Sequence, residues 1–458
     1  MKPSKVLLVL ASIIAILAVM ALVVPANGIR LGGATLRFPT LMSILTSRDG
    51  ESSKRIGNEL VEPPEMSQLR DSISYYKSLV SEGDSRFWMP TANYFDAFWR
   101  NAELARTKGR TIRILHYGDS QIEMDRMSSR LRSYMQDKFG GGGPGMMSAR
   151  TIIPSPAYNI SAPGEMTHLS SFGDSTCVRS RGNYGPMMQC FRMQGGVNIS
   201  VKTSSGRHVD PRTANITSVR LVYNNLGESF SATMDSSVYT SHEKEVSSFR
   251  WTTDTVKRFK LRITGNADLY CILADNGPGV AVDNIPMRGC SGQQFTLVDS
   301  AKLSAAYRQM DVGMIILQFG GNSVPYLHHG KSISTYCQSI GKQIDHLHKC
   351  CPQAVIVFVG PSDMSTSGGA GMKSYDVLPE LIDSLAATAI SHNAAYWSIY
   401  HAMGGQNSMA EWHRQGLAGA DYIHFSQRGA DMMGDRLAEA FNNSYTLYCL
   451  QQKMKKKK

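Results

Sequence analysis

Two short and almost entirely apolar runs constrain the fold of this chain more than any other feature. They read VGMIILQF at 312 to 319 and AVIVFVG at 354 to 360, and a helical pattern around 331 to 348 separates them. Runs of this length without polar alternation are typical of strands that are buried on both faces, as in a parallel sheet covered by helices. Two such strands joined by a helix predict a crossover unit of a parallel sheet.

Other segments extend this alternation in both directions. The flanking elements are helical patterns at 66 to 108, 376 to 391 and about 428 to 441, a short strand at 112 to 115 and a strand at 394 to 400. Strands that alternate with helices predict an α/β fold with a doubly wound parallel sheet. With 42% hydrophobic and 19% charged residues over 458 positions, the composition is that of a globular chain with room for two or three domains.

The segment from about 155 to 284 has a different character. Long helical patterns are absent from it, and alternating runs such as SVRLVY at 218 to 223 and FKLRI at 259 to 263 read as strands. We therefore expect a β-rich domain inserted into the α/β domain. The resulting boundaries are 1–26 for a signal peptide or membrane anchor, 27–65 for a linker, 66–154 and 285–445 for the two parts of the α/β domain, 155–284 for the insertion and 446–458 for a basic tail.

The N-terminus has the features of an export signal. Residues 6–24 are uncharged and apolar, follow Lys2 and Lys5, and precede a Val-Pro-Ala step. Since the run approaches the roughly 20 residues that span a bilayer, a cleaved signal peptide and an uncleaved membrane anchor fit it equally. In either case we expect the remainder outside the cytoplasm, in the periplasm or cell envelope.

Cysteine spacing and charge narrow the range of partners. The eight cysteines show no C-x-x-C spacing of the kind that builds zinc sites, and disulfides are permitted but not required. The net charge of +11 fits a solvated basic surface, and it also fits attraction to an anionic envelope polymer or a membrane. No nucleic-acid-binding motif is present, and the export segment argues against such a partner.

The tripeptide Gly-Asp-Ser occurs three times, ending at Ser85, Ser120 and Ser175. A nucleophilic serine needs an exposed hydroxyl at the carboxyl end of a sheet strand, preferably beside the positive N-terminus of the next helix. Ser120 has this setting, because it follows the strand at 112 to 115 and precedes a helical pattern. The other two serines are expected in turns or helix caps.

Three further segments supply what a serine nucleophile requires: a base, a group that orients the base, and donors for negative charge. In DYIHF, the spacing between Asp421 and His424 can place the carboxylate on one imidazole nitrogen and leave the other for the serine. Asn322 ends QFGGN after an apolar strand, so its amide is expected at the same sheet edge. Gly292 ends RGCSG, whose flexible backbone can offer an N–H to an oxyanion.

The four segments in this order resemble the SGNH, or GDSL-type, hydrolase superfamily, whose blocks match HYGDSQ, GCSG, FGGN and DYIH. The resemblance spans about 110 to 441 apart from the insertion, and it implies a flavodoxin-like sheet. It also implies Ser120 as nucleophile, His424 as general base and then acid, and Asp421 as the group that orients the imidazole. The Ser120 N–H, the Gly292 N–H and the Asn322 side chain would form the oxyanion hole.

One departure from compact members of that superfamily is large, because Gly292 lies 172 positions after Ser120 (292 minus 120). With an inserted domain that is similar to a carbohydrate-binding module, and with MGGQNSMAEW at 403 to 412, the layout resembles exported two-domain peptidoglycan O-acetylesterases. The resemblance implies an exported serine esterase that removes O-acetyl groups from a polysaccharide, with peptidoglycan as the first candidate and no metal or organic cofactor. A polysaccharide O-acetyltransferase with the same triad and an inactive carbohydrate-binding protein stay open as alternatives.

Other candidate sites have simpler interpretations. The glycine run at 139 to 145 lacks a following Gly-Lys-Ser/Thr, so we expect a flexible loop that ends a helix rather than a phosphate loop. His328 with His329, and His346 with His348, lack a matching cluster of further ligands, which favours surface histidines over a metal site. Asp125 and Arg126 are expected to form a structural pair. The absence of G-x-S-x-G argues against an α/β-hydrolase fold.

Overall fold

A computed structural model describes residues 64–173, 178–180, 182–206, 209–368 and 371–457, and the backbone of two short strands, β1 (Ile29–Leu31) and β2 (Ala34–Leu36). These two strands pair antiparallel, with Ile29 opposite Leu36. The chain divides into two units, 1–67 and 68–458, and everything below concerns the second. The predicted export segment lies outside the described residues, as does Ser175. Within the described part, no helix combines the length and apolar character needed to cross a membrane.

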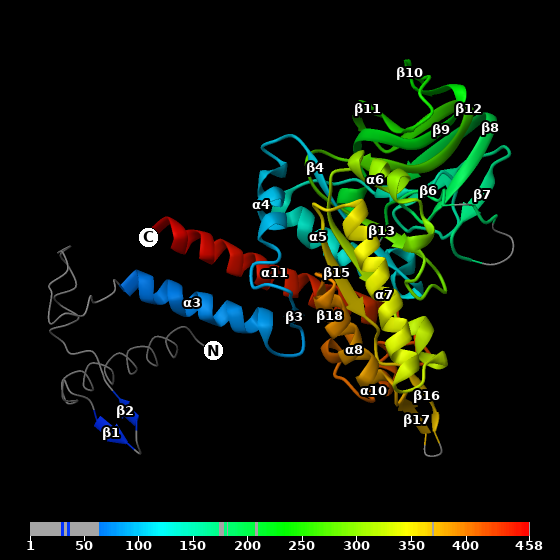
Figure 1. Cartoon of the computed structure of the whole chain (residues 1–458). Coiled ribbons are helices and arrows are strands. Elements are labelled where there is room, and N and C mark those ends of the chain that lie inside the picture. Colours follow the sequence, from blue (N-terminus) through cyan, green and yellow to red (C-terminus); the bar gives the residue numbers. More distant parts are fainter. Residues whose placement is uncertain are drawn as a thin grey trace, which may run out of the picture. The chain divides into compact units, whose positions relative to one another are not determined.

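A six-stranded sheet forms the centre of the second unit (Figure 1). Its order is β13 (Gly279–Pro286), β4 (Thr111–Gly118), β14 (Val312–Gln318), β15 (Val355–Gly360), β18 (Ala395–Ser398) and β3 (Phe87–Trp88). All neighbouring strands are parallel except the edge strand β3, which runs antiparallel to β18. The two apolar runs that predicted this sheet are its adjacent strands β14 and β15.

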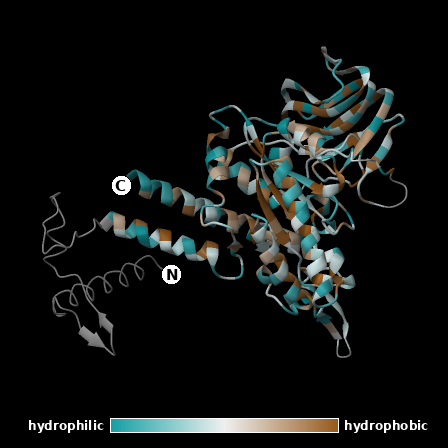
Figure 2. Ribbon diagram, in the orientation of Figure 1, coloured by the Kyte–Doolittle hydropathy of each residue, from teal (hydrophilic) through white to brown (hydrophobic). Residues whose placement is uncertain are grey.

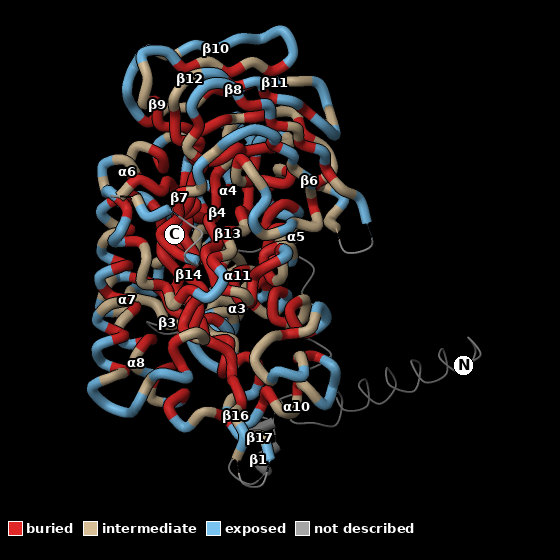
Figure 3. Tube along the Cα trace, turned by 90° about the vertical axis from the view of Figure 1, so that its right-hand side faces the viewer, coloured by how far each residue is buried: buried red, intermediate tan, exposed pale blue. Residues whose placement is uncertain are grey.

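Helices cover both faces of this sheet. Leu115 and Tyr117 on β4 belong to the core shared with α6 (Ser300–Arg308), α7 (Lys331–Cys350) and α8 (Leu378–Ser391). Ile112 and Ile114 belong to the opposite core, with α4 (Asp96–Ala105), α5 (Ser128–Phe139) and α11 (Gln427–Lys457). Figure 3 shows the central strands as buried, with exposed residues on the outer surfaces of the helices. The predicted doubly wound α/β fold is confirmed.

The β-rich insertion is an eight-stranded antiparallel sheet. Its strands are β5 (Gly145–Met147), β6 (Tyr158–Ser161), β7 (Thr167–Ser170), β8 (Gln189–Thr203), β9 (Ile216–Met234), β10 (Ser237–Ser241), β11 (Val246–Val256) and β12 (Arg258–Asp275). Hydrophobic and hydrophilic residues alternate along them (Figure 2). The sheet begins ten residues before the predicted boundary at 155, because β5 pairs with β12. It also ends before 284, because β13 pairs with β4 in the parallel sheet.

Two helical predictions need correction. The helical pattern at 66 to 108 is divided into α3 (Pro64–Ser81) and α4, with β3 between them. The terminal helix does not end near 441 but continues to Lys457, so residues 446–457 of the predicted basic tail belong to this helix. Packing explains the extension: Tyr448 is buried in the core that contains α4, and Tyr445 Oη donates a hydrogen bond to Glu103 Oε1 at 3.0 Å.

The glycine run at 139 to 145 marks the point where the chain leaves the α/β domain. Gly140 ends α5, as predicted, and its carbonyl accepts a hydrogen bond of 3.0 Å from the N–H of Val280, where the chain returns. Gly279 has φ +149°, and a Cβ there would lie 2.1 Å from the carbonyl carbon of Gly140. The run is therefore packed against the returning backbone, and only glycine allows the two segments to approach this closely.

A buried ion-pair network joins the two sheets beside this crossing. Arg113 on β4 donates to both carboxylate oxygens of Asp283 on β13, at 2.7 and 2.8 Å, and to Asp275 at the end of β12, at 2.8 Å. The N–H of Met146 on β5 donates to the same Asp283 carboxylate at 2.8 Å. Burial opposes the charged guanidinium, but the two carboxylates outweigh that effect and raise the pKa of Arg113. The network therefore connects the insertion to the strand that carries the site described next.

Candidate active site

Ser120 lies at the carboxyl end of β4, in the tight turn where the chain leaves the sheet. Asp119 caps a short 3-10 turn, Ser120–Asp125, by accepting a 2.9 Å hydrogen bond from the N–H of Gln121. Helix α5 begins at Ser128, after positive φ angles at Met124, Asp125 and Met127. The serine is thus at the predicted strand end, but a 3-10 turn rather than the long helix follows it directly.

The structure brings Ser120, His424 and Asp421 together from distant parts of the chain. Ser120 Oγ lies 2.7 Å from His424 Nε2, and His424 Nδ1 lies 2.7 Å from Asp421 Oδ2. Asp421 Oδ1 also accepts hydrogen bonds of 3.0 Å from the backbone N–H groups of Ile423 and His424. A nucleophile, a base and a group that orients the base are therefore in hydrogen-bonded sequence, as the resemblance implied.

Gln121 holds the backbone on either side of His424. Its Nε2 donates to the carbonyl of Ile423 at 2.6 Å, and its Oε1 accepts from the N–H of Phe425 at 3.2 Å. Gln121 is buried, so these bonds are protected from competition with water. The residue that follows the serine therefore sets the position of the histidine loop, a role that the sequence reasoning missed.

Arg126 ties the same two segments together from another side. Its guanidinium donates to the carbonyls of Ser120 at 2.7 Å and Phe425 at 3.2 Å. The predicted pair between Asp125 and Arg126 is wrong, because Asp125 instead forms a buried bidentate pair with Arg132, at 2.5 and 2.8 Å. Asp125 has φ +62°, and α5 places Arg132 within its reach.

Asn322 lies at the same sheet edge, in a 3-10 turn (Gly321–Tyr326) that follows β14. Its Nδ2 donates to the carbonyl of Cys290 at 3.0 Å and to Asp119 Oδ2 at 3.3 Å. The longer of these bonds is the weaker one, so the hydrogen that forms it is held less tightly. Asn322 is therefore beside the serine turn, as predicted from its position after a strand.

Gly292 lies in the loop after β13, and its role as a donor stays a prediction. It has φ +84°, and a Cβ there would lie 2.9 Å from the Phe319 side chain. It is not among the residues that line the cavity beside Ser120, whereas Gly289 of the same loop is. The closely packed backbone explains the glycine at position 292, and Gly289 is the part of the loop that faces the cavity.

Burial and hydrogen bonding set the charges around this turn. Burial raises the pKa of Asp119 to about 6, and the hydrogen bond from the Gln121 N–H opposes the shift. For Asp421, burial raises the pKa, but the hydrogen bonds from His424 and Ile423 outweigh it and leave the pKa below its ordinary value. Burial raises the pKa of Cys290 to about 12, which disfavours a thiolate at this position.

A cavity of about 550 Å³ opens beside Ser120 and His424. Tyr326 at its border is 80% exposed, so one aromatic side chain is available to a ligand. Arg288 also lines it and donates to both carboxylate oxygens of Glu123, at 2.5 and 2.6 Å. The cavity thus combines a nucleophile–base pair with an exposed aromatic ring and a charged pair.

The remaining sequence candidates have structural roles. Ser85 lies in the turn between α3 and β3, and its carbonyl accepts a hydrogen bond from Trp397 Nε1 at 3.2 Å. His329 pairs with Glu380 at 2.5 Å, and His348 contacts the carbonyl of Asn393 at 3.0 Å. In the described residues, no group of three or more potential ligands could hold a metal ion. The seven described cysteines, all those except Cys177, are unpaired.

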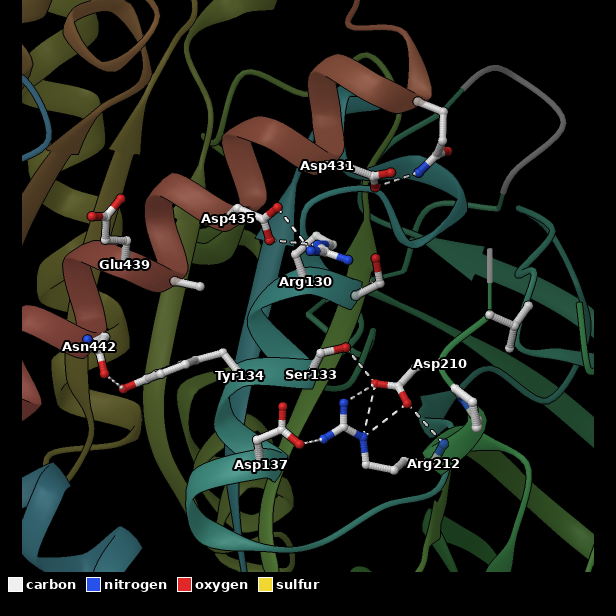
Figure 4. A pocket seen from close by; sticks show the side chains of 15 residues that line it. Arg130, Ser133, Tyr134, Asp137, Asp210, Arg212, Asp431, Asp435, Glu439 and Asn442 are labelled. Atoms are coloured by element: carbon white, nitrogen blue, oxygen red, sulfur yellow. Dashed lines mark hydrogen bonds and ion pairs between the residues drawn. The ribbon is translucent and has the colours of Figure 1, made fainter. Parts of the chain in front are cut away.

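A larger cavity of about 750 Å³ lies between α5, α11 and the segment around Asp210 (Figure 4). Its charged side chains pair with one another, as in the contacts of Arg130 with Asp435 and of Arg212 with Asp210 and Asp137. Tyr134 Oη likewise donates to Asn442 at 3.1 Å. No serine and histidine meet among its lining residues, so it lacks the chemistry of the cavity at Ser120.

Comparison with solved structures identifies the same fold in a peptidoglycan O-acetylesterase. The two structures share 20% sequence identity and a TM-score of 0.66, and the match covers 79% of this chain and 99% of the other. Family-two carbohydrate esterases from Cellvibrio japonicus and Clostridium thermocellum align over 66% and 62% of this chain and 98% and 100% of theirs. Both are 10% identical with TM-scores of 0.26, and such scores carry no information about this fold. No protein-family model matches the sequence. A search of curated proteins also returned no match.

Proposed function

We propose that this chain is an exported serine esterase that removes O-acetyl groups from a polysaccharide, with peptidoglycan as the first substrate to test. The observation that carries the proposal is the continuous hydrogen-bonded series from Ser120 through His424 to Asp421, with distances of 2.7 Å at both steps. The fold shared with a peptidoglycan O-acetylesterase supports the choice of substrate. Export by the N-terminal apolar segment is part of the proposal.

The first half of the reaction forms an acetyl-enzyme. His424 Nε2 accepts the proton of Ser120 Oγ as this oxygen attacks the acetyl carbonyl. Asp421 holds the tautomer that leaves Nε2 free and stabilises the imidazolium that forms. The tetrahedral oxyanion is stabilised by the Asn322 amide and the backbone N–H groups of Ser120 and Gly292, and His424 then protonates the departing sugar oxygen.

The second half repeats these steps with water as the nucleophile. His424 accepts a proton from the water that attacks the acetyl carbonyl, and the collapse of the second tetrahedral intermediate returns the proton to Ser120 and releases acetate. The residues present carry both halves without a bound metal. A sugar hydroxyl in place of water would make the same site a transferase, so the acceptor decides between the two activities.

The cavity supports a glycan substrate. It is open at the surface, and the Tyr326 ring is 80% exposed at its border, where a sugar ring can contact the aromatic face. Arg288 and Glu123 lie on the same cavity and offer both donors and acceptors to hydroxyl groups. An ester of a polysaccharide can thus place its acetyl group at Ser120 while the sugar chain remains in solvent.

The test is acetate release from O-acetylated peptidoglycan and from a small acetyl ester, measured for wild type, Ser120→Ala and Ser85→Ala. We expect turnover by wild type and Ser85→Ala and its loss in Ser120→Ala. The absence of turnover of either ester by folded wild type would overturn the proposal in favour of an inactive binding protein. Transfer of acetyl to an added glycan acceptor, in excess of acetate release, would establish a transferase.

A further inference from the structure

One end of the antiparallel sheet carries basic side chains that the proposed esterase chemistry does not use. Lys202 on β8 lies directly opposite Arg258 on β12. Lys260 and Arg262 follow on β12 at alternate positions, and all four side chains are exposed. We refer to these four residues as the basic face.

The basic face points away from the core of the β domain. On β12, its residues alternate with Phe259, Leu261 and Ile263, which are buried in that core. Because successive side chains of a strand point to opposite faces, the three cations of β12 share one surface, about 7 Å apart along the strand. Lys202 extends this surface to the neighbouring strand.

This arrangement of charge is unfavourable for the isolated protein. Like charges directly opposite each other across two strands destabilise a sheet, and Lys202 and Arg258 are such a pair. In the described part of the chain, neither residue forms an ion pair with a carboxylate. Arg192, on the same strand as Lys202, contrasts with them, because it pairs with Asp268 at 2.7 Å. An anion from outside the chain would remove the repulsion that the fold leaves in place.

A cavity of about 450 Å³ lies against the basic face. Lys202, Arg258 and Lys260 line it, and Asp235 is the carboxylate in the lining. Asn159, Ser161 and Ser200 place amide and hydroxyl groups between the cations. The surface therefore offers cations for acidic groups and neutral donors and acceptors for hydroxyl groups.

We propose that the basic face binds an anionic polysaccharide, whose carboxylates recur along the polymer and whose hydroxyl groups meet the neutral side chains. A lipid surface favours large exposed apolar side chains among the cations. The apolar residues that line this cavity are instead half-buried (Ile160) or buried (Val201 and Phe259). Binding here goes beyond the proposed esterase function and does not depend on it, because the surface belongs to the inserted sheet and contains none of the groups at Ser120.

The test measures binding of the full chain to polygalacturonate, with dextran as a neutral polymer and vesicles of phosphatidylglycerol as a lipid surface. The test variant combines Lys202→Gln, Arg258→Gln and Lys260→Gln. The control combines Lys331→Gln, Lys342→Gln and Lys349→Gln on α7, which removes the same charge from exposed positions. At low salt we expect the test variant to raise the Kd for polygalacturonate at least tenfold and the control to change it less than twofold, with no binding to dextran.

Three results would overturn the proposal. Equal weakening in both variants would mean that net charge alone attracts the polymer, and equal binding of dextran would remove the role of the cations. A loss of binding that is confined to the vesicles would show that the surface binds lipid.

Since the substitutions remove like-charge contacts, the Tm of the test variant should not fall below that of the control. If it does, the single variants Lys202→Gln and Arg258→Gln, each expected to weaken binding about threefold, decide the question.

Discussion

The side-chain amide of Asn322 donates a hydrogen bond to Oδ2 of Asp119 across 3.3 Å. Asp119 immediately precedes the proposed nucleophile, and the residue is 5% exposed. Burial, opposed by the Gln121 N–H, raises its pKa to about 6. Asp119, which accepts the hydrogen bond from Asn322, is therefore disfavoured in its charged form in the folded protein. This has a measurable consequence for stability.

We predict that Asp119→Asn stabilises the protein at neutral pH. The folded-state pKa of about 6 exceeds the ordinary value of 3.8, so the folded protein binds the proton more tightly. The resulting stability is fully present below pH 3.8 and is lost as the pH rises through 6, by about 3 kcal/mol. Asparagine imitates the neutral acid, so urea unfolding should show the variant more stable than wild type at pH 7.5 and similar to it near pH 4.

The exposed Asp84→Asn serves as the control, because a substitution in solvent should change the free energy of unfolding only slightly. The explanation from burial fails if Asp119→Asn changes the free energy of unfolding equally at both pH values. Enzymatic activity is an independent measurement. Asp119→Asn removes a charge beside Ser120, so we expect it to lower kcat even though it stabilises the fold.

We predict that Gln121→Glu lowers kcat about 10- to 100-fold with a much smaller change in KM. A carboxylate can still accept from the Phe425 N–H but cannot donate to the Ile423 carbonyl, so the histidine loop shifts relative to Ser120. Steady-state kinetics on a small acetyl ester separate the two constants. Gln427→Glu, which changes a Gln side chain that bonds to Asp431 on the exposed surface, should leave kcat unchanged. A pure KM effect would assign Gln121 to substrate binding instead.

We predict that Gly292→Ala impairs the protein far more than Gly289→Ala. Both glycines have positive φ angles, +84° and +75°, so alanine costs about 1 kcal/mol of backbone strain at either position. A Cβ at 292 also meets Phe319 at 2.9 Å, whereas one at 289 meets nothing within 4 Å. The test compares the Tm and the kcat of Gly292→Ala with those of Gly289→Ala. Similar losses in the two variants would show that packing against Phe319 does not position the loop.

We predict that Arg113→Met lowers the free energy of unfolding by about 3–5 kcal/mol, because it leaves Asp283 buried without its partner. Arg130→Met is the matched control. Arg130 also forms two hydrogen bonds to one carboxylate, that of Asp435, but both side chains are about half exposed, so the loss should stay below about 1 kcal/mol. Urea unfolding of both variants checks the contrast, and comparable losses would refute the importance of burial.

The sequence was sufficient to predict the parallel sheet and the position of Ser120 and Asn322 at one of its edges, whereas the meeting of His424 with Ser120 was implied by the resemblance of the four segments to a known superfamily. Buried parallel strands have a local signature, and the residues that follow them gather at one edge because the strands end there. The groups that hold this arrangement were not predictable in the same way. Gln121 bonds to backbone atoms 302 and 304 positions away, and nothing in the residues around it indicates those partners. The only feature of the sequence that pointed to Gln121 was its position next to Ser120.

The boundaries of the insertion were missed for a similar reason. The sequence of β13, GVAVDNIP, is compatible with either sheet, and its assignment depends on pairing with β4, more than 160 positions earlier in the register Val282 to Ile114. The length of α11 likewise depends on contacts with α4 rather than on its own pattern, which becomes mostly polar after Leu450. Tertiary pairing, rather than local preference, decided each of these cases.

The close approach of Gly140 and Gly279 has a consequence for the order in which the molecule folds. Closing a flexible loop costs conformational entropy that grows by about 0.6 kcal/mol with each doubling of its length, so bringing β13 to β4 through an unstructured insertion is costly and slow. Once the insertion has folded, its two ends are already in contact, and the remaining closure resembles that of a tight turn. The β insertion thus converts the pairing of β13 with β4, which joins residues 168 positions apart (282 minus 114), into a nearly local one. We therefore expect the edge strand β13, and the loop that carries Gly292, to form only after the insertion is in place.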